Sequence, residues 1–135
     1  MKNIVQNWAP YKVEAPMLSA PYLSKKDMIN MLIAEGIQPP RLYGMGFAHN
    51  NCGGFCIKSG QAQFAQLLKT FPERYAYHEQ KEREIREKLN KNISVLKHRS
   101  GPNKGKPWTL EDFRKNLECK GSFDKAEWGG CGCFI

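Results

Sequence analysis

The placement of the cysteines constrains this chain more than any other feature. Cys52 and Cys56 enclose two glycines, and Cys131 and Cys133 lie one residue apart near the end of the sequence. Glycine lets the backbone curl tightly, so each close pair can direct two sulfur atoms to one point. The five cysteines are an odd number, and a reducing cytoplasm disfavours a disulfide framework. We therefore expect Cys52, Cys56, Cys131 and Cys133 to bind a metal.

The identity of the metal stays open at this point. Four thiolates suit a tetrahedral zinc ion or an iron–sulfur cluster, and the spacing does not distinguish these cofactors. Cys119 and His49 are spare ligand candidates. A metal that joins residues 52–56 to residues 131–133 would close a long loop and hold an irregular tail on a small core. The alternative is that the cysteines are small buried hydrophobic residues.

Length and composition describe one small folded domain. A chain of 135 residues buries only about two thirds of its unfolded surface, so its core is modest. A hydrophobic content of 41% with 25% charged residues is typical of a globular protein. No apolar run reaches the length of a membrane helix, and no secretory leader follows Met1. We therefore expect a cytoplasmic protein with no membrane partner.

The charge of the chain is strongly positive. A formal net charge of +8 favours polyanionic partners such as nucleic acid. The candidate contacts with nucleic-acid phosphates lie in one basic segment: Lys97, Arg99, Lys104 and Lys106. This predicts, as an alternative function, a small basic nucleic-acid-binding module.

Three prolines punctuate the start of the chain: Pro10, Pro16 and Pro21. They predict an extended lead-in over residues 1–23 that packs along something else. Ser24 is a natural N-cap with Asp27 three residues later, which predicts a helix that starts there. Gly36 is expected to end it.

Helical periodicity returns at residue 61, with apolar residues along one stripe. Pro72 is expected to divide this helix from a longer one over residues 73–89. Residues 93–96 are expected to form a short strand, and Thr109 is expected to cap a last helix.

These signals predict a mainly α fold: a small helical domain with irregular, Cys-rich metal-binding segments and at most a minor β element. We expect residues 24–118 to form the helical domain, which contains the HNNCGGFC loop. Residues 119–135 are expected to form a Cys-rich tail that folds back on residues 52–56.

Two motifs that would indicate a defined chemistry are absent. A radical-SAM signature, C-x3-C-x2-C, would need a third cysteine at the position of Ser59. A phosphate-binding P-loop is approached by residues 101–107, but its glycines are one residue too close and Pro107 replaces the hydroxyl that would hold magnesium. Neither chemistry is expected of this chain.

Residues 40–61, PRLYGMGFAHNNCGGFCIKSGQ, carry a dense pattern around the first cysteine pair. This stretch closely resembles the P-x-x-Y-x-x-G-F-x-H-N-N-C-G-G-x-C-[VI]-[KR]-[AS]-G-Q pattern of phage and bacterial proteins. Those proteins are of the phosphoadenosine phosphosulfate (PAPS) reductase-like family, in the PP-loop adenine nucleotide α-hydrolase group. The similarity extends to residues 14–17 and 23–27 upstream and to residues 71–75 and 128–134 downstream.

In that family these elements follow an α/β domain whose S-G-G-x-D-S loop binds the ATP phosphates, and this chain has no such loop. The resemblance therefore implies a metal-binding C-terminal or accessory part of an oxidoreductase-related, PAPS-reductase-like protein that is not catalytic alone. The implied partner is a PP-loop catalytic half or subunit. The implied location is the cytoplasm, that of the bacterial host if the gene is phage-encoded.

The polar residues beside the first cysteine pair have two interpretations. His49, Asn50 and Asn51 offer donors and acceptors for a substrate, and Lys58 adds a charge for a phosphate or sulfate group. The two asparagines could equally be turn residues that satisfy backbone groups around the metal. A complete small reductase that uses Cys119 or the C-x-C pair is a third function left open; no catalytic base is visible for it.

Overall fold

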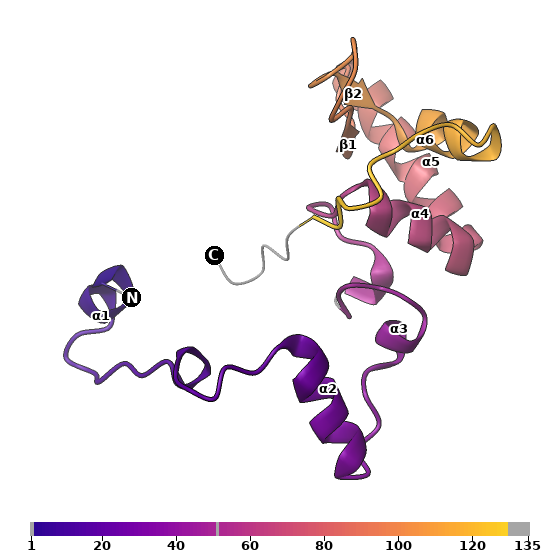
Figure 1. The fold of residues 1–135 in the computed structure, drawn as a ribbon. Helices are drawn as coiled ribbons and strands as arrows, with labels where there is room; N and C mark the ends of the chain where they lie inside the picture. Colours follow the sequence, from indigo (N-terminus) through magenta and orange to yellow (C-terminus); the bar gives the residue numbers. More distant parts are fainter. Residues whose placement is uncertain (1, 51, 130–135) are drawn as a thin grey trace. The chain divides into compact units, whose positions relative to one another are not determined.

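The computed structural model of the chain describes residues 2–50 and 52–129 (Figure 1). Over these residues the fold is mainly helical, with one two-stranded antiparallel sheet, as the sequence predicts. The chain divides into two compact units, Met1–Pro39 and Pro40–Ile135. The division lies at the Pro39–Pro40 pair, beyond the expected start of the helical domain at residue 24. Among the described residues, no helix is both long enough and apolar enough to cross a bilayer.

The first unit holds two α-helices, α1 (Lys2–Asn7) and α2 (Lys25–Ala34), and a short 3₁₀ turn (Pro16–Leu18) between them. The expectation of a fully extended lead-in was therefore wrong at its start. No proline or glycine interrupts the chain before Pro10, so nothing prevents a short helix there.

Helix α2 begins as the sequence predicts. The backbone N–H of Asp27 donates to Ser24 Oγ at 3.2 Å, and the backbone N–H of Ser24 donates to Asp27 Oδ2 at 2.9 Å, which completes a capping box. The hydrogen bonds from the Ser24 side chain and backbone lower the pKa of Asp27. Gly36 follows the helix with a φ of +74°, in the left-handed region that glycine tolerates.

The first unit has no core of its own among the side chains that the structure describes. None of them in residues 5–16 and 18–39 is buried, and α2 carries Met31 and Ile33 more than half exposed, at 54% and 56%. Most of the large apolar residues that are exposed, among those whose burial the structure describes, lie here. These side chains are Val5, Trp8, Tyr11, Leu18, Tyr22, Leu23, Met31, Leu32, Ile33 and Ile37.

The second unit holds the described core. Its elements are α3 (Arg41–Gly44), a 3₁₀ turn (Cys52–Gly54), α4 (Gln61–Thr70), α5 (Pro72–Leu89), β1 (Leu96–Lys97), β2 (Pro107–Trp108) and α6 (Leu110–Glu118). Helices α4, α5 and α6 pack on one another. The buried cluster consists of Leu42, Phe47, Phe64, Leu67, Tyr75, Leu96, Trp108, Leu110 and Phe113.

Helix α4 buries its predicted apolar stripe, and Pro72 stands at the first position of α5, where its missing N–H has no cost. Both predictions are confirmed. The chain turns between the two helices at Phe71, whose ring stacks on Phe47 with the centroids 6.0 Å apart. This corner places the start of α5 beside the loop that carries the first cysteine pair.

The predicted strand at residues 93–96 is shifted. Only Leu96 and Lys97 form strand β1, paired antiparallel with Trp108 and Pro107 of β2. The N–H of Val95 donates instead to Glu82 Oε1 at 2.8 Å, so a side chain takes the place of a strand partner. The prediction missed this because the acceptor is a side chain of α5, 13 residues earlier in the chain, and not a neighbouring strand.

Buried polar groups join α5 to α6. Glu82 Oε2 accepts from the N–H of Leu110 at 2.7 Å, and the Tyr75 hydroxyl donates to the Leu110 carbonyl at 2.7 Å. Burial raises the pKa of Glu82, although the N–H donors oppose that shift. Thr109 caps α6 as predicted, its Oγ1 accepting from the N–H of Asp112 at 3.0 Å. The start of α6 is therefore fixed by side chains from two elements.

Candidate metal centre and its surroundings

The first cysteine pair lies on a loop with an unusual backbone. Cys52, Gly53 and Gly54 have φ angles of 51°, 59° and 90°, all in the region that non-glycine residues avoid. A cysteine at positive φ is uncommon and needs surrounding structure to hold it. Cys52 is exposed and Cys56 is half-buried.

Contacts with Phe47 and with side chains of α4 and α5 hold the loop on the helical core. Gly54 is buried, and a Cβ added there would lie 3.0 Å from Phe47 Cε1, so only glycine fits without displacing the core. Gln63 Nε2, from α4, donates to the Gly54 carbonyl at 2.9 Å. On the other side, Arg74 Nη1 donates to the Gly53 carbonyl. Neither Gln63 nor Arg74 could be identified from the sequence, since neither belongs to a periodic or local motif.

The described part of the tail pairs with the segment that follows the first cysteine pair. Ser59 and Gly129 form an antiparallel bridge. The N–H of Gly60 donates to the Trp128 carbonyl at 3.1 Å, and the N–H of Ala62 donates to the Glu127 carbonyl at 2.9 Å. The tail up to Gly129 therefore runs back along residues 59–62, three residues after Cys56 in the sequence.

This pairing depends on two glycines. A Cβ on Gly60 would lie 2.2 Å from the Glu127 carbonyl oxygen. A Cβ on Gly129 would lie 2.5 Å from both the Lys58 carbonyl oxygen and the Gly60 nitrogen, and Gly129 also has a φ of +75°. The two backbones thus approach too closely for any side chain at either position.

A buried glutamine joins the tail to the hairpin formed by strands β1 and β2. The Gln61 side chain is 1% exposed, and its Oε1 accepts from the N–H of Asp124 at 2.8 Å. Its Nε2 donates to the Lys97 carbonyl at 3.1 Å. Glu127 accepts from the N–H of Gln61 at 3.4 Å and pairs with Arg99. Sequence analysis missed Gln61, because a glutamine at a helix start is read as exposed.

The structure describes two of the four predicted metal ligands. Cys52 and Cys56 share the loop just described, whereas Cys131 and Cys133 lie outside the described residues. Cys119, a spare candidate, is exposed at the C-terminal end of α6. Within residues 2–50 and 52–129, no group of three or more His, Cys, Asp or Glu side chains could hold a metal ion.

The predicted substrate-binding residues are also divided. His49 and Asn50 are half-buried and Lys58 is exposed, while Asn51 lies outside the described residues. Asn50 Oδ1 accepts from the N–H of Leu42 at 3.3 Å, the backbone role that the sequence analysis held open for this residue. Its Nδ2 remains as a donor, so this bond does not decide against contact with a ligand.

A shallow hollow of about 500 Å³ lies on the exposed side of the loop, lined by Cys52, Gly53, Phe55, Arg74, Tyr77 and His78. The ring of His78 stacks on Phe55 with centroids 3.4 Å apart. Burial, with the positive charge of Arg74, lowers the pKa of His78 and favours the neutral ring. Tyr75, on the same helix, is buried and belongs to the core cluster.

The residues present fit a thiolate-bound metal as far as the structure describes them. Two free cysteines stand on a loop that buried contacts hold in place, and the tail, as far as Gly129, pairs with the segment that follows this loop. Soft thiolates select zinc or iron–sulfur clusters over calcium or magnesium, which prefer oxygen ligands.

The candidate nucleic-acid residues lie on the β1–β2 hairpin. Lys97, Arg99, Lys104 and Lys106 are all exposed, and every residue from 99 to 106 is exposed. Two of them have partners: Arg99 pairs with Glu127, and Lys106 Nζ donates to Asn103 Oδ1 at 3.1 Å. The four charged groups are therefore accessible to a ligand, but two of them already contact other residues of the chain.

Comparisons with protein-family models, with curated proteins and with solved structures find no match to this chain.

Proposed function

We propose that this chain is a metal-binding module in which Cys52, Cys56, Cys131 and Cys133 bind one zinc ion or iron–sulfur cluster. The observation that carries the proposal is the backbone pairing of Ser59 with Gly129. It joins a residue three positions after Cys56 to a residue two positions before Cys131, although the two are far apart in the sequence.

The length of the chain supports this arrangement. Cys131 follows Gly129 by two residues, and two residues span at most about 7 Å. Cys56 precedes Ser59 by three residues, at the same end of the antiparallel pair. A metal there would close the loop between the core and the tail, which adds stability that a small core lacks.

We further propose that the module is the C-terminal or accessory part of a PAPS-reductase-like PP-loop protein and is not catalytic alone. The support is the pattern of residues 40–61 and the absence from the sequence of an S-G-G-x-D-S loop. The only sheet among the described residues has two antiparallel strands, unlike the parallel sheet that a PP-loop domain requires. The partner would then be a PP-loop catalytic half in the same cytoplasm.

The test is metal and acid-labile sulfide analysis, with visible spectra, on protein purified without oxygen. One zinc per chain, or iron with sulfide, is the expected result, and the two outcomes identify the cofactor. The variants Cys52→Ser and Cys131→Ser should each lose most of the metal. Cys119→Ser is the matched control and should keep it. Metal-free wild-type protein, or equal loss in all three variants, would refute the four-cysteine site.

A second function, nucleic-acid binding, is favoured by the exposure of residues 99–106 together with the net charge of +8. Lys104→Gln combined with Lys106→Gln should weaken binding to a short DNA duplex and reduce the slope of log affinity against log salt by about two. Lys25→Gln combined with Lys26→Gln removes the same charge from α2 and serves as the control. An equal effect of both pairs would indicate unspecific charge attraction.

A further inference from the structure

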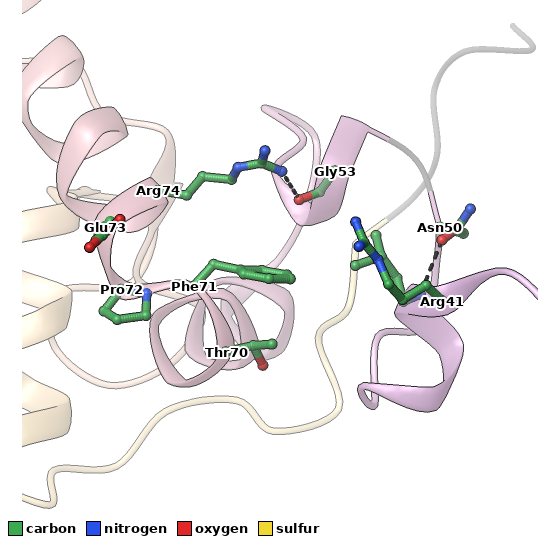
Figure 2. A pocket seen from close by; sticks show the side chains of 9 residues that line it. Arg41, Asn50, Gly53, Thr70, Phe71, Pro72, Glu73 and Arg74 are labelled. Carbon is green, nitrogen blue, oxygen red and sulfur yellow. Dashed lines mark hydrogen bonds between the residues drawn. The ribbon is translucent and has the colours of Figure 1, made fainter.

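A pocket of about 740 Å³ lies at the junction of α3, the cysteine loop and the start of α5 (Figure 2). Its walls include Arg41, Asn50, Gly53, Phe71, Glu73 and Arg74. This volume is in the range of small-molecule sites. The proposal below concerns this pocket and does not depend on whether the cysteines bind a metal.

Two arginines supply most of the charge of the pocket. Within the described residues, neither Arg41 nor Arg74 forms an ion pair with a carboxylate, and Arg41 has no hydrogen-bond partner. Among the described residues of the lining, Glu73 alone is acidic. In Figure 2 its carboxylate lies on the α5 side, away from Arg41 and Asn50. Among the described residues, the pocket therefore combines two arginines that have no carboxylate partner with one acidic residue that lies away from Arg41.

Arg74 is held in place before any ligand arrives. Its Nη1 donates to the Gly53 carbonyl, and its guanidinium lies over the Phe71 ring, 5.8 Å from the centroid. A guanidinium has five N–H donors, so the contact with Gly53 leaves others for a ligand. An arginine fixed in this way loses less conformational freedom on binding than a solvated one.

The backbone at this place adds further donors. Helix α5 has 18 residues, and its N-cap, Phe71, provides no side-chain acceptor. Pro72 has no N–H, but the N–H groups of Glu73 and Arg74 in the first turn have no partner within the helix. They carry the positive end of the helix dipole toward the pocket. Asn50 contributes its Nδ2, because its Oδ1 is used by Leu42.

We propose that this pocket binds the phosphate or sulfate group of a small molecule, with Arg41 and Arg74 as the charged contacts. Bidentate arginine contacts match the geometry of these tetrahedral oxyanions. The remaining volume accommodates the organic part of an ester. The pocket shares Gly53 and Arg74 with the hollow beside Cys52, so a ligand bound here lies next to the cysteine loop.

The experiment is isothermal titration calorimetry of the full chain at low ionic strength with inorganic phosphate, sulfate and an alkyl phosphate, against a chloride background. Saturable binding at one site is expected. Arg41→Gln should weaken it about tenfold, the loss of one charge-assisted contact. Lys69→Gln removes the same charge from an exposed position on α4 outside the pocket, and should change the affinity less than about twofold.

A variant that should strengthen binding keeps the test independent of any folding defect, because a folding defect would only weaken binding. Glu73→Gln removes the only acidic residue of the lining and should tighten binding. The three ligands separate a free anion from an ester, since an ester that binds more tightly than phosphate uses the rest of the pocket. Equal weakening by Arg41→Gln and Lys69→Gln would overturn the proposal. So would binding of a single-stranded oligonucleotide without binding of any of the three anions.

Discussion

At the scale of single residues, the buried carboxylate of Glu82 joins α5 to two backbone N–H groups, those of Val95 and Leu110. Burial raises its pKa above the ordinary value of 4.5, so the folded protein binds this proton more tightly than the unfolded chain. The resulting stabilisation is full below about pH 4.5 and is lost as the pH rises through the higher folded pKa.

Glu82→Gln places an amide N–H₂ where one N–H donor needs an acceptor. We expect a loss of about 1–3 kcal/mol of unfolding free energy at low pH. This loss should become smaller as the pH rises, because only the wild type loses the proton-linked stabilisation. Urea unfolding from pH 4.5 to pH 7 measures both quantities. A difference that grows with pH would mean that the N–H donors outweigh burial.

Gly129 is a second residue whose role follows from its surroundings, which leave no room for a side chain. Gly129→Ala places a Cβ about 2.5 Å from two backbone atoms at a φ of +75°, so the pairing with Ser59 should break. We expect a loss of about 1 kcal/mol or more in unfolding free energy, and a weaker metal affinity. Gly44→Ala is the control, since nothing lies within 4 Å of its Cβ. Metal binding as tight as in the wild type would separate the tail pairing from the metal site.

At the scale of elements, α2 and α6 begin with the same type of cap in different surroundings. Thr109 and Ser24 each accept an N–H bond from an aspartate three residues later. Helix α6 buries Leu110 and Phe113, whereas α2 buries none of its residues.

Thr109→Ala should therefore lower the global unfolding free energy by about 1 kcal/mol. Ser24→Ala should leave the main transition unchanged and only increase local amide exchange in α2. Chemical unfolding with hydrogen exchange tests both. Equal effects of the two variants would mean that α2 unfolds together with the core.

The sequence predicted those elements that local chemistry specifies. Caps, the break at Pro72 and the apolar stripe of α4 depend on neighbouring residues, and all three are present. The strand at residues 93–96 was misplaced, because a carboxylate from α5 competes for its backbone. The return of the tail toward residues 52–56 was expected from its cysteines, but its backbone pairing with Ser59 and the role of Gln61 were not. These contacts join residues 70 and 63 positions apart, which leave no periodic signal.

The candidate sites show the same division. The first cysteine pair and its glycines could be identified from spacing, and Asn50 was expected to serve either a ligand or the backbone. The pocket formed by Arg41 and Arg74 could not, because it requires α3 and the start of α5 to meet around the loop. Isolated arginines in a basic chain carry no pattern that separates a site from a solvated surface.

At the scale of the whole molecule, the two units differ in what stabilises them. Every buried hydrophobic residue among those described lies between Leu42 and Phe113, while residues 5–16 and 18–39 contribute none. The hydrophobic contribution to folding therefore belongs to the second unit. The first unit instead carries large apolar side chains that are exposed to solvent.

A chain that begins at Pro40 should consequently fold by itself, with a midpoint of thermal unfolding within a few degrees of that of the full chain. It should also bind less of a hydrophobic dye such as ANS, because the exposed Trp8, Tyr11 and Tyr22 are removed. Calorimetry and dye fluorescence on the two proteins, at equal metal content, measure these differences. A large fall in the unfolding midpoint would show that residues 1–39 stabilise the core. In that case their apolar side chains would be packed within the chain and would not be available to a partner.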